Sequence, residues 1–394
     1  MSSALRDSHE FVVIGGGPAG SALAALLARQ GRDVALLEKD AFPRDKVCGE
    51  FLSPEAQDSL RRIDCLEAVL AKGPERIKSA KLFAPYGKPV ALPLTGESLG
   101  VSRAVLDELL FRHAAQSGAV ALEGAQVRAI HSSGDQTSVE VEISGGNRLP
   151  ERRCVQARIV IGAYGRRSRL DRQLDRPFIA KDHPFIGLKR HHRPRDGAAG
   201  HDLSAALRGS VELHAFRDGY GGVSFVEDDV VNVCLLVSRS FVHGLGSPGW
   251  EAVTRTLKDL SPTLHDRLQA LSPAEEAVHA VAQIGFESKE TSSGPLLFVG
   301  DAAAMIAPLC GDGQAMALRS AELLADLLAS QPRLNGASLA RHWDARWRAE
   351  FNGRMRIGRL LQTLMLSPWS CAAAIAMTRL VPPVGRRLVA ATRG

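Results

Sequence analysis

The sequence predicts an α/β protein in three parts: a domain around a parallel β-sheet, a second domain around an antiparallel β-sheet, and a helical C-terminal region. Three observations lead to this prediction. A glycine-rich strand–helix–strand pattern occupies residues 10–40, alternating strand patterns fill residues 184–282, and apolar residues at helical spacing dominate from about residue 334. The chain of 394 residues is long enough to build such separate units.

The composition is typical of an ordinary cytoplasmic protein. Hydrophobic residues make up 45% of the chain, and no run approaches the roughly 20 apolar residues that a bilayer requires. The first ten residues are polar, which argues against a signal peptide. The six cysteines are scattered without a C-x-x-C motif, so we expect reduced thiols. Aromatic residues are scarce and form no stacking motif, so nucleic acid is not an expected partner.

The strongest motif is the segment "EFVVIGGGPAGSALAALLARQGRDVALLEKD", in which a strand, a helix and a second strand follow one another. Gly15 permits the tight turn, Gly17 lets the backbone approach a pyrophosphate at the helix N-terminus, and Gly20 allows close helix–strand packing. Glu38 ends the second strand, where it can accept hydrogen bonds from both ribose hydroxyls and would repel the 2′-phosphate of NADP. This Rossmann-like unit predicts a dinucleotide site. Its predicted contact residues are Gly15, Gly17, Pro18, Ala19, Gly20, Glu38 and Lys39.

A second segment, "GPLLFVGDAAAMIAPLCGDGQAMALRSAELLADLL", indicates that the dinucleotide is a flavin. Asp301 follows a strand and a glycine turn, and a carboxylate there can hold a hydroxyl of the ribityl chain. A helix predicted from about Gln314 to Leu328 would direct its positive N-terminal end at the edge of the ring that becomes negative on reduction. The residues predicted for this part of the site are Gly300, Asp301, Gly311, Gly313 and Gln314.

With "GAYGRRSRL" and "VSRAVLDELLFRHAAQSG", these motifs resemble, in order and spacing, the FAD-dependent oxidoreductases of the aromatic hydroxylase fold. That group includes para-hydroxybenzoate hydroxylase-like monooxygenases and geranylgeranyl reductase-like proteins. The resemblance covers most of residues 10–330 and implies FAD, bound in a Rossmann-like domain of the GR2 type. It also implies that Arg103, which opens a helix, contacts the FAD. It does not specify the reaction.

The chain departs from the family pattern at three places. The third family motif normally reads Ala-Asp-Gly, and this chain reads Ala163-Tyr164-Gly165. The missing aspartate leaves open whether NAD(P)H is the electron donor, or whether Tyr164 merely packs over the adenosine side. A helper histidine is replaced by the run Ala302-Ala303-Ala304. The W-x-W-x-I-P motif of flavin halogenases is absent, so halogenation is not expected.

The segment "PRDKVCGEFLSP", residues 43–54, follows the strand that ends at Glu38. Taken alone, Cys48 is typical of a buried packing thiol. Geranylgeranyl reductase-like proteins carry a similar lysine–x–cysteine–glycine segment, which in the resembled fold runs past the pyrophosphate toward the flavin. Arg44 and Lys46 are therefore predicted phosphate neighbours, and their charges would favour a thiolate. We predict Cys48 at the flavin or substrate pocket, with a direct chemical role and a packing role both open.

The antiparallel domain is predicted to roof a substrate cavity above the flavin. Alternation along "PFIGLKRHH" places Lys189 and His191 on one face of a strand and Arg190 and His192 on the other, without indicating which pair faces the cavity. Tyr220, between two glycines, is predicted in the pocket wall and is the second catalytic candidate beside Cys48. The predicted domains are 1–78, 101–175 and 286–333 for FAD, 79–100 and 176–285 for the substrate sheet, and 334–394 for the C-terminal helices.

The C-terminal region is basic: from Asn352 onward it has no acidic residue. Such a segment is usually a solvated helix face, but it also suits an anionic membrane surface or an acidic partner. With the apolar helical stripe before it, it favours a hydrophobic or carrier-bound substrate. The arginines concerned are Arg354, Arg356, Arg359, Arg379, Arg386, Arg387 and Arg393.

Three functions compete. The resemblance favours an FAD-dependent monooxygenase that hydroxylates or epoxidises a hydrophobic or aromatic small molecule through a flavin hydroperoxide. The Cys48 segment favours the alternative, a geranylgeranyl reductase-like enzyme that reduces carbon–carbon double bonds. A flavin-binding protein without turnover is the third hypothesis, and the complete redox-side motifs argue against it.

Overall fold

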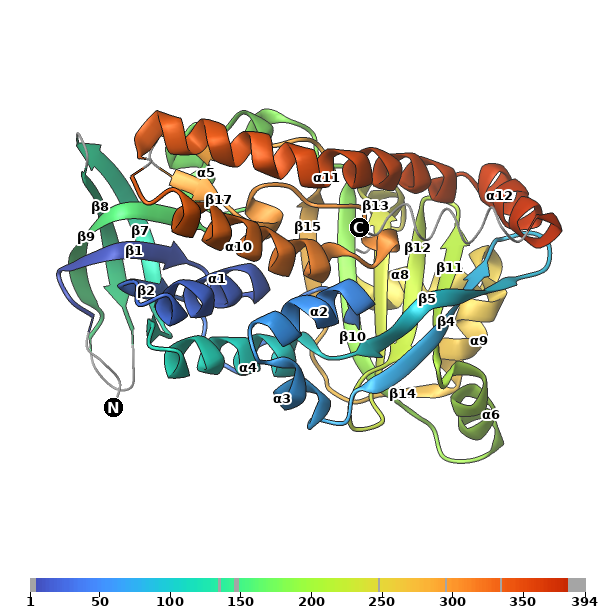
Figure 1. Ribbon diagram of the computed structural model, residues 1–394. Helices are drawn as coiled ribbons and strands as arrows, with labels where there is room; N and C mark the ends of the chain where they lie inside the picture. The colour runs from blue at the N-terminus through green and yellow to red at the C-terminus, as the bar shows by residue number, and fades with distance from the viewer. Residues whose placement is uncertain are drawn as a thin grey trace.

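The computed structural model describes residues 5–133, 136–144, 149–246, 249–294, 296–333 and 335–381. Two β-sheets lie side by side, each with its own helices, and a long C-terminal helix runs along both of them (Figure 1). The predicted α/β class with two sheets and C-terminal helices is confirmed.

The first sheet has a parallel centre, because apolar strands with helical crossovers become buried on both faces. Its order is β16-β17-β9-β1-β2-β6, and β7 and β8 extend it as an antiparallel meander from β9. Every pairing from β17 to β6 is parallel. The strands are β1 (Ser8–Ile14), β2 (Val34–Leu37), β6 (Val120–Leu122), β7 (Ala125–Ser133), β8 (Gln136–Ile143), β9 (Glu151–Gly162), β16 (Ser292–Ser293) and β17 (Leu296–Phe298).

Three helices form the frame of the cofactor side. They are α1 (Pro18–Arg29), α4 (Arg103–Gln116) and α10 (Gly313–Ser330). Alanines and leucines on α1 and α10 are buried in one core cluster with the central strands, which fixes both helix N-termini at the carboxyl ends of β1 and β17. The shorter helices beside them are α2 (Pro54–Arg62), α3 (Leu66–Leu70) and α5 (Leu170–Gln173), with 3₁₀ turns at Pro177–Ala180, Gly300–Ala302 and Pro308–Cys310.

The second sheet follows the order β14-β10-β13-β12-β11-β4-β5-β3, with β15 paired to β10. Neighbours are antiparallel except β4 and β11, which are parallel. The antiparallel pairing of β12 and β13 agrees with the strand patterns predicted over residues 184–282. The strands are β3 (Phe51–Leu52), β4 (Glu75–Phe83), β5 (Val90–Gly100), β10 (Phe185–Pro194), β11 (Ser210–Phe216), β12 (Gly219–Phe225), β13 (Val231–Ser238), β14 (Leu271–Pro273) and β15 (His279–Ile284).

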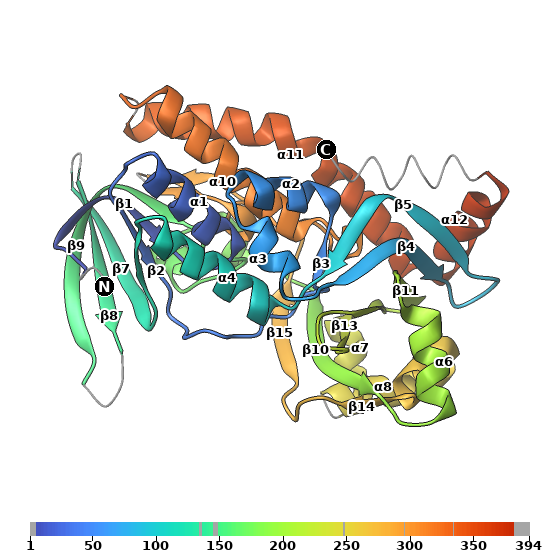
Figure 2. The ribbon, with the colours of Figure 1, turned by 60° about the horizontal axis from the view of Figure 1, so that its bottom comes forward.

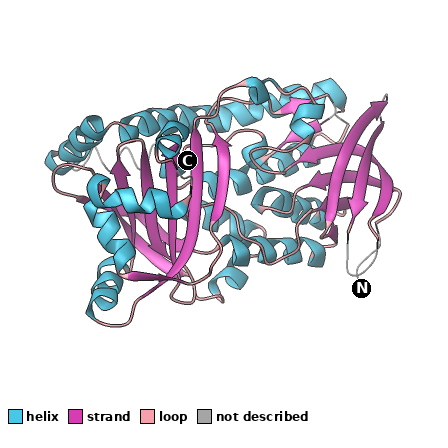
Figure 3. Cartoon of the chain, turned by 180° about the vertical axis from the view of Figure 1, so that it is seen from behind, coloured by secondary structure: helices cyan, strands magenta, loops and turns pink. Residues whose placement is uncertain are grey.

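One face of the second sheet is covered by four helices, which Figures 2 and 3 show from below and from behind. Apolar residues of α8 and α9 pack with β12 and β13 in a separate core cluster, so this sheet has its own hydrophobic core. The helices are α6 (Ala198–Leu207), α7 (Arg239–Gly244), α8 (Trp250–Leu260) and α9 (Pro262–Gln269). On the opposite face, Ala215 of β11 packs with Met365 and Cys371 of the C-terminal helices.

The C-terminal helices are α11 (Gly336–Leu366) and α12 (Pro368–Leu380). The Trp343 indole of α11 donates to the Phe298 carbonyl of β17 (3.0 Å), which ties the helix to the first sheet. Among the described residues no single helix is long and apolar enough to cross a membrane; only α11 and α12 together meet that test, and the chain bends by 112° between them. Arg386, Arg387 and Arg393 of the basic segment lie outside the described residues.

Two segments of the second sheet lie before residue 79. Strand β4 starts at Glu75, and β3 adds Phe51–Leu52. The predicted domain limits themselves stay a prediction. The short β3 strand matters for the site, because it joins the segment of Cys48 to the substrate sheet.

Candidate flavin site

The glycine-rich turn between β1 and α1 is packed too tightly for side chains. Gly15 has φ +109°, and a Cβ there would lie 2.6 Å from the Ala163 carbonyl oxygen. A Cβ on Gly20 would lie 1.9 Å from the Gly15 carbonyl oxygen. These contacts let α1 begin at Pro18 and Ala19, directly against the ends of β1 and β9. The helix therefore presents its unpaired N–H groups at the sheet edge.

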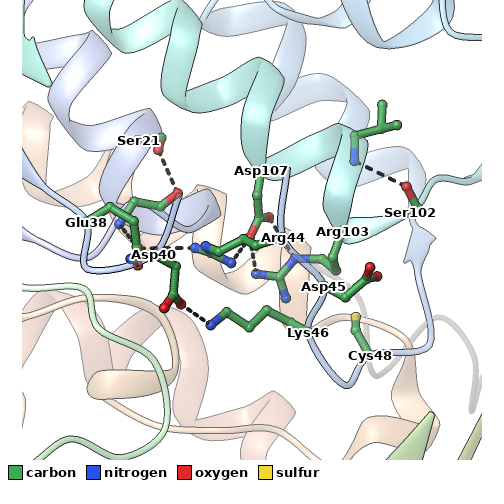
Figure 4. Close-up of polar contacts among 12 residues, drawn as sticks. Ser21, Glu38, Asp40, Arg44, Asp45, Lys46, Cys48, Ser102, Arg103 and Asp107 are labelled. Atoms are coloured by element: carbon green, nitrogen blue, oxygen red, sulfur yellow. Dashed lines mark hydrogen bonds and ion pairs between the residues drawn. The ribbon is translucent and has the colours of Figure 1, made fainter. Parts of the chain in front are cut away.

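Gly17 opens toward two arginines. The position of its missing Cβ lies 3.7 Å from Nη2 of Arg103 and 4.0 Å from Nη2 of Arg44. Both guanidinium groups are held by the fully buried Asp107, through bonds of 2.7 and 2.8 Å from Arg103 and one of 2.8 Å from Arg44 (Figure 4). Two positive charges beside a helix N-terminus make a site for a pyrophosphate. Asp107 was not predicted from the sequence, although its i+4 spacing from Arg103 is typical of a helical ion pair.

Glu38 is buried at the end of β2. Its Oε2 accepts from the Gly16 N–H (2.7 Å), and its Oε1 accepts from the Asp40 N–H (3.0 Å). Arg44 lies 3.2 Å away. Its predicted role toward ribose hydroxyls stays a prediction. Lys39 and Lys46 are not brought to the arginine pair, since both ammonium groups bind Asp40, at 3.2 and 2.9 Å.

Asp301 lies at the opposite side of the α1 N-terminus. Burial raises the pKa of its carboxyl group, while Lys289, Arg103 and Arg166 act in the opposite direction. Its carboxylate makes no hydrogen bond within the described ranges, so it is available to a ligand hydroxyl. Gly300 (φ +60°) and Gly311 (φ +70°) adopt left-handed turns around it. A Cβ on Gly300 would meet that of Ala19 at 2.9 Å, and Gly313 begins α10 beside the same space.

Cys48 lies where the cofactor side meets the substrate sheet. Its Sγ accepts from the Gln314 side-chain amide (3.3 Å) and from the Glu50 N–H (3.4 Å). The Arg103 guanidinium is a charged neighbour of this thiol. The backbone carbonyl of Cys48 accepts a hydrogen bond from the Asn232 side chain of β13 (3.0 Å). The thiol therefore contacts residues of three predicted groups: the Cys48 segment, the α4 arginine and the start of α10.

Glu50 fixes this segment and was not identified from the sequence. It is fully buried and has φ +57°, a strained value for glutamate. Its carboxylate accepts from the Arg103 N–H (2.8 Å), binds the Lys189 ammonium (2.5 Å) and lies 2.7 Å from Nε2 of His191. Lys189 and His191 thus face the Cys48 segment, on the same face of β10 as predicted. No local signal marks Glu50, because its partners come from α4 and β10.

Tyr220 is buried on β12 and donates from its hydroxyl to the Gln362 side chain of α11 (3.0 Å). Burial raises the pKa of the phenol well above its ordinary value. The ring belongs to an apolar cluster with Leu236 and Ile284, against which partly buried residues pack. Those residues are Phe185, Leu213, Val281, Phe286, Met305 and Leu309. Tyr220 therefore lies in a buried apolar cluster, and both its place in a pocket wall and its catalytic role stay predictions.

Tyr164, which replaces the family aspartate, donates to the buried carboxylate of Asp171 (2.7 Å) and meets Phe298 edge-on at 6.1 Å. Asp171 also binds the buried Arg176 (2.9 Å). Burial raises the pKa of the Tyr164 phenol, so the ring stays neutral. The tyrosine therefore belongs to a structural network at the end of β9.

The observed residues fit FAD. The Gly17 opening with its two guanidinium groups suits the pyrophosphate, and the unbonded Asp301 carboxylate suits a ribityl hydroxyl. The line between them crosses the α1 N-terminus, and the contact of Cys48 with Gln314 lies beside the second sheet. FAD bound along it would bring hydride and electron transfer to the boundary of the two sheets.

Comparison with known proteins supports the same cofactor. Residues 9–197 match the model of an FAD binding domain. A menaquinone reductase of Mycolicibacterium smegmatis is 30% identical over 349 residues, which cover 83% of this chain and 78% of the relative. The chain belongs to the FAD-dependent oxidoreductases of the aromatic hydroxylase fold. The predicted family, cofactor and enzyme class of this oxidoreductase are confirmed.

One further relative and two solved structures are similar to this oxidoreductase over most of its length. A menaquinone reductase of Mycobacterium tuberculosis is 28% identical over 92% of the chain and 85% of its own length. Among solved structures, the myxobacterial chondrochloren halogenase has a TM-score of 0.78 at 20% identity, with 97% of this chain and 91% of the halogenase covered. A geranylgeranyl bacteriochlorophyll reductase-like protein of Thermoplasma acidophilum has a TM-score of 0.76 at 19% identity, with 94% and 91% covered. At these identities the structures show the fold alone.

Proposed function

We propose that this flavoprotein reduces a carbon–carbon double bond in a hydrophobic, isoprenoid-type lipid. The observation that carries the proposal is the Cys48 thiol, which contacts Gln314 and Arg103 at the boundary between the cofactor side and the substrate sheet. Curated relatives aligned over most of the chain act on menaquinone, a quinone with a polyprenyl chain, and this supports a substrate of that class.

The chain itself would supply a proton and a dry binding wall. FAD supplies the hydride, so the second reacting carbon needs a proton from the protein or from water. We assign that transfer to the Cys48 side chain, whose Sγ is held in position by the Glu50 N–H and the Gln314 amide. The apolar cluster around Tyr220 would bind the hydrocarbon and exclude water.

The monooxygenase expected from the resemblance is the second candidate, because an apolar, water-excluding wall serves it equally well. The position of Cys48 argues against it. A half-exposed thiol beside activated oxygen would be prone to oxidation to sulfenic acid, which would end turnover.

A pyridine nucleotide is the proposed electron donor. A shallow polar surface near Asp301 carries Arg166, Arg167 and Lys289, among others, and such cations suit the phosphates of NAD(P)H. Burial lowers the pKa of Lys289 to about 8. Anaerobic addition of NADH or NADPH should therefore bleach the flavin, more slowly in Arg167→Gln. Bleaching at the wild-type rate in the variant would exclude this surface as the donor site.

The direct test of the reductase uses Cys48→Ser and Cys48→Ala, with Cys154→Ser on the surface of β9 as the matched control. The flavin is reduced without oxygen and mixed with menaquinone. We expect both Cys48 variants to retain FAD, but menaquinone should reoxidise their flavin at least tenfold more slowly than in the wild type. Cys154→Ser should behave like the wild type. An unchanged reoxidation rate in Cys48→Ala would show that Cys48 only packs and takes no part in the reaction.

Contact with an anionic membrane surface is part of the proposal, because an isoprenoid lipid resides in membranes. Large apolar side chains are exposed on α12 and next to it, including Trp369 (76%) and Leu380 (83%). Trp369 stacks near Tyr86 of the β4–β5 turn (5.1 Å between ring centroids), and Arg356 and Arg379 are exposed nearby in sequence. Apolar side chains combined with arginines suit the interface of anionic lipids.

A further inference from the structure

A cluster of histidines and carboxylates lies between the Cys48 segment and the edge of the substrate sheet. Asp45 comes from that segment, Glu275 from the loop before β15, and His279 begins β15. One ligand atom of each lies within 4.8 Å of the others. His191 of β10 adjoins them, with its Nδ1 3.5 Å from the Glu275 Oε1. None of these side chains was assigned to the flavin or to the substrate.

The facing atoms of the cluster lack hydrogen bonds. The Glu275 Oε1 and the His279 Nε2 are buried and make none within the described part of the chain. They are 3.7 Å apart, and His279 Nε2 is 4.0 Å from the Asp45 Oδ2. These separations are long for hydrogen bonds. They are close to the roughly 3.4 Å that separates ligands bound at about 2.1 Å around a tetrahedral zinc ion.

The orientation of His191 fits the same interpretation. Its Nε2 lies 2.7 Å from the Glu50 carboxylate, while its Nδ1 faces Glu275. A metal-binding histidine commonly engages a carboxylate through its second nitrogen, which sets the tautomer and directs the free nitrogen at the metal. Glu50 fixes His191 through Nε2, so that the His191 Nδ1 lies beside Glu275 at the rim of the cluster.

The charges of the cluster also suit a divalent cation. Asp45, Glu50 and Glu275 carry three negative charges, and the Lys189 ammonium that binds Asp45 (2.7 Å) and Glu50 (2.5 Å) neutralises one. With neutral histidines the remainder is about two negative charges.

We propose that Asp45, Glu275 and His279 bind one divalent cation of the zinc class, with His191 of β10 beside Glu275. Imidazole nitrogen combined with carboxylate oxygen favours zinc over magnesium, which prefers oxygen ligands alone. The ion would fasten the segment that carries Cys48 to β10 and β15. This inference does not depend on the reaction proposed above, since it concerns only how the segment is held.

The test measures zinc binding to the flavin-loaded protein. After removal of metals with EDTA and dialysis, ZnCl₂ is titrated by calorimetry, and the bound metal is counted by mass spectrometry. We expect one equivalent in the wild type and at least about tenfold weaker binding in His279→Gln and in Glu275→Gln. His131→Gln is the matched control, because His131 forms an exposed pair with Glu140 (3.1 Å) on the distant β7–β8 hairpin. MgCl₂ should not compete at equal concentration.

The proposal would be overturned by either of two results. The wild type could show no saturable zinc binding, or both ligand variants could bind zinc as tightly as the wild type and His131→Gln. Flavin content and circular dichroism of each variant establish folding. If one variant does not fold, the other and the wild-type titration still decide the question.

Discussion

Asp107 concentrates the charge of the predicted pyrophosphate site, because one buried carboxylate holds the guanidinium groups of both Arg44 and Arg103. Neither arginine has to be ordered when FAD binds, which lowers the entropic cost of binding. Lys46, in contrast, binds Asp40 away from this pair. The three cations predicted near FAD are therefore not equivalent.

Arg103→Met should weaken FAD binding roughly ten- to hundredfold, because one charge-assisted hydrogen bond to phosphate is worth about 1.5–3 kcal/mol. Lys46→Met is the control and should change the dissociation constant less than threefold. Flavin fluorescence during titration of the apoprotein measures both. Equal losses in the two variants would show that Lys46 also contacts the cofactor.

His192 makes the fold sensitive to acid. It is buried on β10 against Trp250 (5.6 Å), and burial lowers its pKa to about 4. In the unfolded chain the pKa of His192 is near 6.5, so between pH 6.5 and pH 4 the unfolded state binds a proton that the folded state does not bind. The free energy of unfolding therefore falls as the pH drops from 6.5 toward 4. Urea unfolding should show a loss of about 2 kcal/mol from this residue between pH 7 and pH 5. His192→Leu should remove that part of the loss; the same slope in the variant would contradict this assignment.

At the scale of elements, α11 closes the substrate side by lying on β12. The Tyr220 hydroxyl and the Gln362 amide form the buried polar contact between them. Tyr220→Phe should lower the free energy of unfolding by about 1–2 kcal/mol, because it leaves the Gln362 acceptor unpaired. Urea unfolding measures this loss. Turnover that falls more than tenfold in folded, FAD-loaded Tyr220→Phe would establish the catalytic role predicted from the sequence.

The N-terminal end of α12, which carries Trp369, should govern membrane contact. We expect the protein to sediment with vesicles that contain phosphatidylserine but much less with neutral vesicles, and salt should weaken the binding. Trp369→Glu should reduce the bound fraction at least threefold, whereas Leu149→Glu, at an exposed position outside the C-terminal helices, should not. Equal binding of wild type and Trp369→Glu would show that α12 is not the contact surface.

At the scale of the whole molecule, the sequence predicted what local geometry determines. The spacing of Gly15, Gly17 and Gly20 located the first crossover, because Gly15 and Gly20 are in close contact with the backbone of the turn and the adjacent strand, and Gly17 leaves open space beside two arginines. Alternation in β10 correctly placed Lys189 and His191 on one face. Glu50 was missed as a site residue because its partners come from α4 and β10, which only tertiary packing brings together. Asp107 has a local partner in Arg103, one helical turn away, but its bond to Arg44 depends on tertiary packing.

The central claim is that the reduced flavin acts on a double bond rather than on oxygen, and oxygen-free turnover tests it most directly. The reduced holoprotein is mixed anaerobically with menaquinone, and the lipid is analysed by mass spectrometry after exposure to air. We predict recovery of oxidised flavin and a product that keeps two added hydrogens, since a mere quinol would lose them again in air. Flavin that is reoxidised only when oxygen is admitted, with an oxygen atom in the product, would contradict the account.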